Sequence, residues 1–216
     1  MYSVPHLLKL FFVLEWRLKF AVQGVTVQMF ASVFLIFLSI DFLELKVWNA
    51  LFWLMVLFNT MNNIARGFLS ESDGKMLYYH SICKAEALIL SKIIFNSLVS
   101  VILLLLFTVI YSIVLSFKIK YSLLFILLSI LFTIGLSAVF TMVSAIAQNA
   151  GNSYILIPVL GLPLMIPLVM ITAKCSKKLM NEMLVTSVYY DLGALVLLDF
   201  MIVYLAVILY KFIWKN

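Results

Sequence analysis

Few residues of this chain could carry chemistry, because only 11% of its residues are charged. Asp199 is the single acidic side chain inside the long apolar runs of the sequence. No basic residue shares that apolar environment, so we expect Asp199 to be protonated or hydrogen-bonded to neutral groups. The candidate partners are asparagines of other runs: Asn59, Asn62, Asn63 and Asn96. Asp199 is then either a gating group or a structural hydrogen-bonding residue, unless its helix starts late and leaves it near the outer membrane surface.

The sequence contains no phosphate-binding loop of the Gly-x-x-x-x-Gly-Lys-Ser/Thr type. Gly74-Lys75 is preceded five residues earlier by Leu69 and followed by Met76, so it cannot cradle nucleotide phosphates in that way. Cys83 and Cys175 fall on opposite sides of the membrane in the topology given below, so we expect no disulfide. We predict no metal site and no catalytic residue.

The elements that must position these residues are membrane helices. Apolar residues make up 66% of the 216 residues, and the mean hydropathy is +1.19. The run from Tyr121 to Ala173 has no charged residue and no histidine, and would make roughly 80 Å of helix, far more than the ~30 Å needed to cross a bilayer. The chain must reverse within this run, and the polar cluster from Gln148 to Ser153 is the expected turn.

Charge-free stretches predict an all-α membrane protein with one domain, residues 1–216, and six transmembrane helices. The predicted spans are residues 21–40, 47–65, 93–117, 121–147, 154–173 and 192–210. Nine of the 15 basic residues fall on the side that holds both termini, which predicts cytoplasmic termini. The net charge of +6 follows from these clusters beside the spans and does not indicate nucleic-acid binding.

An amphipathic helix is predicted before the first span, over residues 4–20. Its apolar face comprises Leu7, Leu10, Phe11, Leu14 and Leu18. Glu15 and Arg17 point elsewhere, so the segment reads as a helix lying in the membrane interface. The alternative is an extension of the first span.

The one substantial polar segment runs from residue 66 to 92, on the predicted cytoplasmic side. Ser70 or Ser72 can cap a short helix, and Gly74 permits a tight bend. Such a helix, held by two spans, can transmit a push from a soluble partner into the bundle. An ordinary solvated loop explains the same residues.

The predicted fifth span contains Pro158, Gly161, Pro163 and Pro167. Each proline removes a backbone donor, so we expect a kinked or broken helix. The kink is either a moving element or a static feature of packing. In the fourth span, Ser137, Thr141 and Ala145 form a stripe of small residues that lets another helix approach closely.

Three motifs resemble the heme exporter B permease family of cytochrome c maturation (CcmB). The first is Phe68, Glu71 and Asp73-Gly74, followed by an apolar stretch that leads to Leu90-Ser91-Lys92. The second is the Leu162–Pro167 stretch, similar to the family's Leu-Pro-Leu-x-Ile-Pro, and the third is Glu15-Trp16-Arg17. The chain departs from the family in having Ser81-Ile82-Cys83-Lys84 where several prolines follow the Asp-Gly loop.

The resemblance implies an ABC-2 (type V exporter-like) permease in the bacterial inner membrane. A separate ATPase subunit would bind ATP and dock on the coupling residues, which are Phe68, Glu71, Asp73, Gly74, Lys75 and Leu77. Heme would be handled by a second membrane subunit and by a periplasmic heme chaperone. This chain has only His6 and His80 as histidines, both outside the spans, so we expect it to bind no heme directly.

Other classes of protein remain as alternatives. An ABC-2 permease that exports a drug, lipid or polysaccharide would share the interfacial helix and coupling segment but not the Leu162–Pro167 match. An intramembrane phosphatidyl-alcohol transferase would need further aspartates on adjacent helices after Asp73, and the sequence has none within reach. A purely structural membrane scaffold would function without any ATPase.

Overall fold

The computed structural model describes residues 4–17, 20–39, 44–69, 83–115, 121–149, 153–181 and 185–214. These ranges contain seven helices and no strand, which confirms the all-α prediction. The helices are α1 (Val4–Arg17), α2 (Phe20–Ser39), α3 (Leu45–Leu69), α5 (Ala85–Leu115), α6 (Ser122–Asn149), α7 (Ser153–Met180) and α8 (Val185–Ile213).

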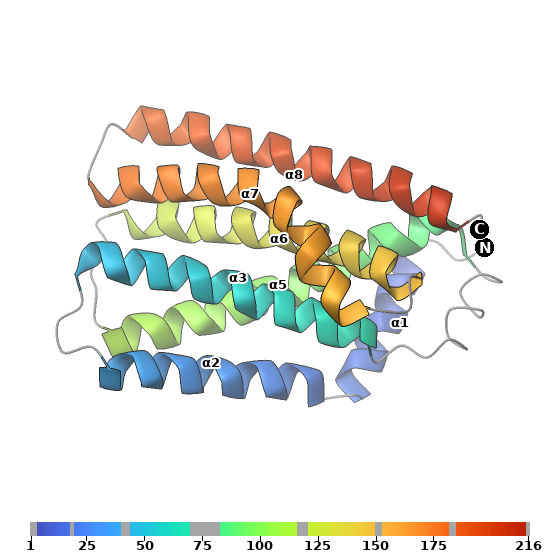
Figure 1. Ribbon diagram of the computed structural model, residues 1–216, viewed down its shortest axis with the longest axis horizontal. Coiled ribbons are helices and arrows are strands. Elements are labelled where there is room, and N and C mark those ends of the chain that lie inside the picture. The colour runs from blue at the N-terminus through green and yellow to red at the C-terminus, as the bar shows by residue number, and fades with distance from the viewer. Residues whose placement is uncertain are drawn as a thin grey trace.

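Six of these helices run side by side along the long axis of the molecule, and α1 lies across one end (Figure 1). Both chain termini are at that end, together with the last residues of α3 and the first residues of α5. The predicted grouping of the termini with this part of the chain therefore agrees with the helix arrangement. Cys83 precedes α5 and Cys175 lies near the end of α7, at opposite ends of the bundle, and the two form no disulfide.

Four helices within the described ranges are long and apolar enough to cross a membrane: Ala85–Leu115, Ser122–Gln148, Leu156–Met180 and Thr186–Phe212. The apolar stretch of α2 from Gly24 to Ser39 is shorter. The α3 helix is continuous but less apolar, because its sequence contains several asparagines. Large apolar side chains cover the outside of the bundle, including Phe34 on α2, Ile113 on α5 and Phe200 on α8. A surface of this kind suits hydrocarbon and identifies a multi-pass membrane protein.

The helices extend beyond the predicted spans because charged residues limit a span without ending a helix. The α5 helix begins at Ala85, eight residues before the predicted span, and includes Lys92. Similarly, α3 continues to Leu69, so the predicted polar segment 66–92 is helical at both ends. The expected connection from Lys174 to Asp191 is likewise mostly helix, with α7 ending at Met180 and α8 starting at Val185.

The predicted reversal lies where the sequence places it. The α6 helix ends at Asn149 and α7 begins at Ser153, so the turn falls within Gln148–Ser153. Gly151 and Asn152 in this interval favour helix termination. The α6 helix is central: it contacts α3, α5, α7 and α8. Its small residues Ser137, Thr141 and Ala145 are all buried, as the predicted stripe requires.

The α1 helix packs against α5 through part of its predicted apolar face. Leu7 and Phe11 are buried, and the Phe11 and Phe95 rings lie 5.9 Å apart between centroids. Phe12 meets the same ring edge-on at 5.1 Å. Glu15 and Arg17 belong to the last turn of α1, and their side chains are outside the described part of the structure.

Candidate functional site

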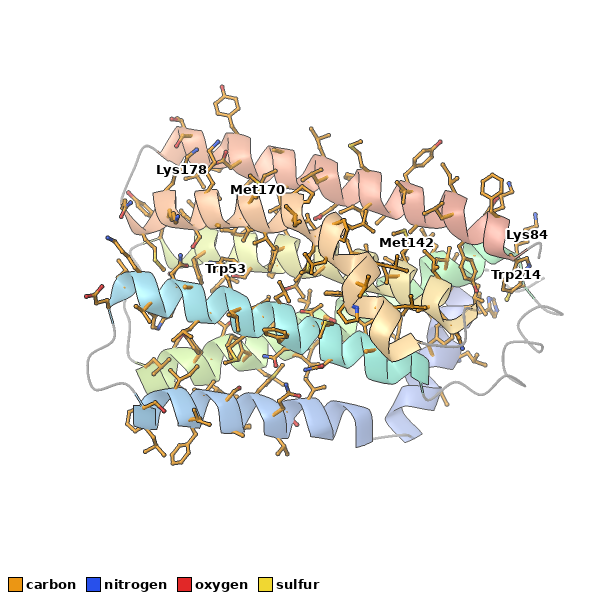
Figure 2. All side chains as sticks on the ribbon, in the orientation of Figure 1. Trp53, Lys84, Met142, Met170, Lys178 and Trp214 are labelled. Atoms are coloured by element: carbon orange, nitrogen blue, oxygen red, sulfur yellow. The ribbon has the colours of Figure 1, made fainter. Side chains whose placement is uncertain are left out.

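Two sets of ion pairs on α8 mark levels near the two ends of the bundle. Toward one end, Asp191 accepts from Lys178 Nζ at 2.6 Å and lies 3.4 Å from Lys174 Nζ, both on α7. Toward the other, Lys211 Nζ lies 3.0 Å from Glu86 on α5. Figure 2 labels Lys178 and Lys84 at these opposite ends. Asp191 and Lys211 are twenty residues apart, about 30 Å of helix, which equals the thickness of the hydrocarbon core.

Asp199 lies between these two levels, at the midpoint of α8. By helix rise it is about 12 Å from Asp191 and about 18 Å from Lys211. The residue is only 7% exposed, and neither carboxyl oxygen has a hydrogen-bond partner among the described residues. Because α8 starts at Val185, the alternative of a late start, with Asp199 near the outer surface, is wrong.

The Asp199 carboxyl fits against Gly135 of α6. A β-carbon added at Gly135 would overlap Asp199 Oδ1 and would lie 3.1 Å from Leu168 Cδ2 on α7. Three helices therefore meet here, and the absence of a side chain at position 135 makes room for the carboxyl. Sequence reasoning found the acid but missed Gly135, whose only signal was a glycine among large apolar residues of the fourth span.

None of the asparagines considered as partners of Asp199, all of them among the described residues, bonds to its carboxyl group. Asn63 Nδ2 donates to Ser100 Oγ at 3.1 Å, and Asn96 Nδ2 donates to Thr141 Oγ1 at 2.9 Å. Asn59 lines a small cavity between α2, α3 and α5. These asparagines join α3 to α5 and α5 to α6, whereas Asp199 contacts α6 from α8. The predicted hydrogen bond from these asparagines to Asp199 is therefore absent.

The α7 helix bends in its middle, and the bend is plain in Figure 1. Pro158, Pro163 and Pro167 are all inside the helix and all exposed, while Gly161 is buried. A β-carbon at Gly161 would lie 3.1 Å from the Phe140 ring of α6. The predicted kink is present. The α7 helix approaches α6 at Gly161, between the first two prolines, and at Leu168, directly after the third.

Of the predicted coupling residues, only Phe68 falls within the described residues. Phe68 is in the last turn of α3, but its side chain is not among those described. Glu71, Asp73, Gly74, Lys75 and Leu77 lie outside the described residues altogether. The structure locates the two helices that hold this segment and gives no geometry for the segment itself.

Within the described ranges, no group of three His, Cys, Asp or Glu residues could hold a metal ion. His6 is exposed on α1, and His80 is outside the described residues. Hydroxyl and amide groups of α3, α5 and α6 form hydrogen bonds between these helices.

The sequence model of the CcmB protein family matches residues 14–211, which is nearly the whole chain. The chain belongs to the CcmB family. The resemblance seen in three short motifs is thereby confirmed over all six long helices. Searches of curated proteins and of solved structures found no match.

CcmB proteins are permease-type membrane subunits of the heme exporter system of cytochrome c maturation. Family membership accounts for the apolar surface and for the scarcity of reactive side chains. It also favours this system over a permease for a drug, lipid or polysaccharide.

Proposed function

We propose that this CcmB protein is the permease subunit of an ATP-binding-cassette complex in the bacterial inner membrane. A separate ATPase binds and hydrolyses ATP, and this chain passes the resulting movement to partners that handle heme. The family match over residues 14–211 is the observation that carries the proposal. The chain itself is non-catalytic and binds neither ATP nor heme directly.

The proposed fold is the six-span ABC-2 type, with α2, α3, α5, α6, α7 and α8 as the spans and α1 in the membrane interface. The α2 and α3 helices are included because each runs along the long axis of the bundle beside the longer apolar helices (Figure 1). An even number of spans agrees with both termini at one end. We assign that end to the cytoplasm, since it carries most of the basic residues.

The ATPase docks on the segment between α3 and α5. In support of this, both helices continue past the predicted spans toward that segment, so the segment is connected at each end to a long helix. The buried contact of α1 with α5 joins the interfacial helix to one of these helices. The partners are the ATPase subunit, a heme-handling membrane subunit and a periplasmic heme chaperone. ATP hydrolysis drives heme export or release of the heme-loaded chaperone.

Purification of the tagged chain in mild detergent tests the assignment. We expect an ATPase and a heme-handling membrane subunit to accompany the wild-type chain. Asp73→Lys or Gly74→Pro should remove the ATPase and lower c-type cytochrome assembly, while the bundle keeps its thermal stability. Glu44→Lys is the matched control, because Glu44 is an exposed acid at the opposite end of the bundle.

The outcomes separate the parts of the proposal. Normal ATPase recovery with both Asp73→Lys and Gly74→Pro would reject the coupling segment. Recovery of an ATPase without any heme-handling subunit would reject the role in cytochrome c maturation. Full function with a catalytically dead ATPase would indicate a structural scaffold.

A further inference from the structure

A buried polar seam runs along the interior of the bundle from its middle to the end that carries the termini. On α6 it consists of Ser137, Thr141, Ser144 and Gln148, which recur at intervals of four, three and four residues on one helical face. On α5 it consists of Lys92, Asn96, Ser97 and Ser100. Three bonds tie the seam together: Ser97 to Ser137 at 3.2 Å, Asn96 to Thr141 at 2.9 Å, and Asn63 to Ser100 at 3.1 Å.

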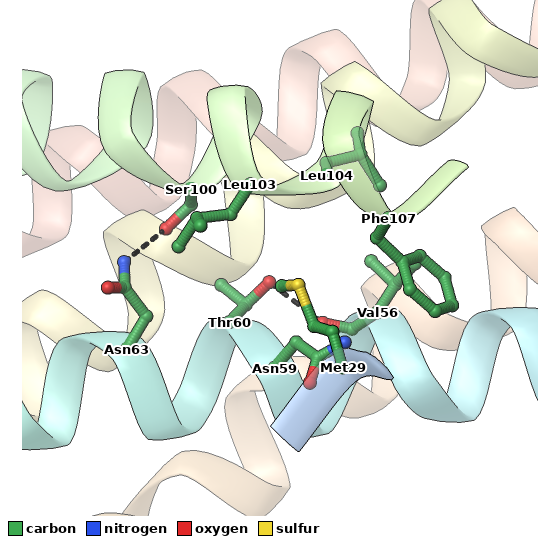
Figure 3. Close-up of a pocket in the computed structure, with 9 residues that line it drawn as sticks. All are labelled: Met29, Val56, Asn59, Thr60, Asn63, Ser100, Leu103, Leu104 and Phe107. Atoms are coloured by element: carbon green, nitrogen blue, oxygen red, sulfur yellow. Dashed lines mark hydrogen bonds between the residues drawn. The ribbon is translucent and has the colours of Figure 1, made fainter. Parts of the chain in front are cut away.

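The seam ends in a cavity at the middle of the bundle (Figure 3). The cavity is lined by Met29 of α2, by Val56, Asn59, Thr60 and Asn63 of α3, and by Ser100, Leu103, Leu104 and Phe107 of α5. All nine residues are buried. The space open to a water molecule is about 10 Å³, close to what one water occupies by this measure.

Asn59 places an unpaired hydrogen-bond donor at this cavity. Its side chain is 5% exposed, and its Nδ2 has no partner among the described residues. By contrast, Thr60 Oγ1 donates to the Val56 carbonyl at 2.8 Å, and Asn63 Nδ2 donates to Ser100. An amide donor left bare in the hydrocarbon region costs several kcal/mol, so a partner for Asn59 is strongly favoured.

We propose that the cavity binds one ordered water molecule, which accepts a hydrogen bond from Asn59 Nδ2. The polar groups of Thr60, Asn63 and Ser100 line the same space and supply its remaining contacts. Buried waters are held by two to four such contacts. The permease is thus hydrated at its core, at the inner end of a polar seam, independently of the role proposed above.

Met29 is the barrier between this water and the lipid. It lines the cavity and also a larger apolar groove on the outer surface between α2 and α5, of about 420 Å³. The α2 helix contacts only α3 and α5 to any extent among the described helices. A displacement of one side chain on a peripheral helix would therefore join the hydrated core to the membrane-facing groove.

Radiolytic oxidation tests the water directly. X-ray pulses split bound water into hydroxyl radicals, which oxidise a neighbouring methionine to its sulfoxide. Met29 and Met142 are both 2% exposed, and Met142 does not line the cavity, so Met142 is an internal control for burial. Because Met29 also lines the outer groove, the variants below separate the bound water from radicals formed in bulk solvent. In the purified wild-type protein we expect Met29 to be oxidised several times faster than Met142, as measured by mass spectrometry.

Two variants locate the water. Asn59→Leu replaces the amide by an apolar group of similar size, and should lower Met29 oxidation to the rate of Met142. Asn62→Leu makes the same change at a neighbouring α3 residue that does not line the cavity, and should leave Met29 oxidation high. Equal rates for Met29 and Met142 in the wild-type protein would overturn the proposal, even if Asn59→Leu fails to fold. Unchanged Met29 oxidation in folded Asn59→Leu would also overturn it.

Discussion

At the scale of single residues, the fit of Asp199 against Gly135 is the most specific feature of this molecule. The acid could be predicted from the sequence, because a lone carboxyl in an apolar run must be buried within a bundle or lie at its edge. Its neighbour could not, since nothing in one sequence pairs a residue of α8 with a residue of α6. The candidate asparagines were expected at a similar depth in the membrane, but Asn63 bonds to Ser100 and Asn96 bonds to Thr141.

Gly135→Ala should destabilise the subunit. The new β-carbon would overlap Asp199 Oδ1 and crowd Leu168, and overpacking of this kind costs roughly 1–3 kcal/mol. Thermal unfolding in detergent measures the effect. Gly193→Ala is the control, because a β-carbon there meets nothing within 4 Å, and it should leave stability unchanged or slightly raised.

A second substitution identifies the cause of that loss. Asp199→Ala in the Gly135→Ala background removes the overlapping oxygen, so the pair should lose less stability than the two single changes added together. Strict additivity would show that Asp199 and Gly135 are not in contact.

At the scale of elements, the spans could be predicted and the helix ends could not. Each predicted span, defined as a run without charged residues, overlaps one observed helix. The polar cluster at Gln148–Ser153 correctly predicts the turn between α6 and α7. The observed helices extend past the predicted spans because a lysine such as Lys92 or Lys174 is costly in hydrocarbon but is compatible with a helix. The bend in α7 was predictable, since three prolines in one helix leave carbonyls without donors.

Pro163→Ala tests whether α7 must change its conformation at the bend for the protein to function. Alanine restores the missing N–H, and Pro163 is exposed, so little packing is lost. We expect the purified subunit to be at least as stable as wild type and the cells to assemble less c-type cytochrome, which assumes the proposed function. Leu162→Ala, at a neighbouring residue that is 50% exposed, should leave assembly unchanged. Normal assembly with Pro163→Ala would show that the bend is a static feature of packing.

At the scale of the whole molecule, the ion pairs and the hidden polar groups divide the bundle by depth. Asp191 with Lys178 and Lys211 with Glu86 lie about 30 Å apart along α8. Polar side chains between these levels are buried, and some of them form hydrogen bonds from one helix to another. The polar seam occupies only the half toward the termini. The opposite half holds an aromatic cluster in which Trp48, Phe52 and Tyr111 pack between α3 and α5. Beside it, Ser176 Oγ and Trp53 Nε1 both donate to Asn49 Oδ1, at 2.5 Å and 2.8 Å. The half away from the termini therefore combines aromatic packing with a separate polar cluster.

Cysteine labelling tests the orientation of the bundle in the membrane. In a chain with Cys83→Ser and Cys175→Ser, single cysteines replace the exposed residues Glu44, Lys177 and Lys84. Glu44 and Lys177 are at one end of the bundle and Lys84 is at the other (Figure 2). An impermeant thiol reagent applied to cells with a permeabilised outer membrane should label positions 44 and 177 at once, and position 84 only after the inner membrane is opened. Labelling of position 84 alone in intact cells would invert the topology and move the α3–α5 connection away from any cytoplasmic ATPase. Labelling of position 44 without position 177 would contradict the helix arrangement itself, because the start of α3 and the end of α7 would then lie on different sides of the membrane.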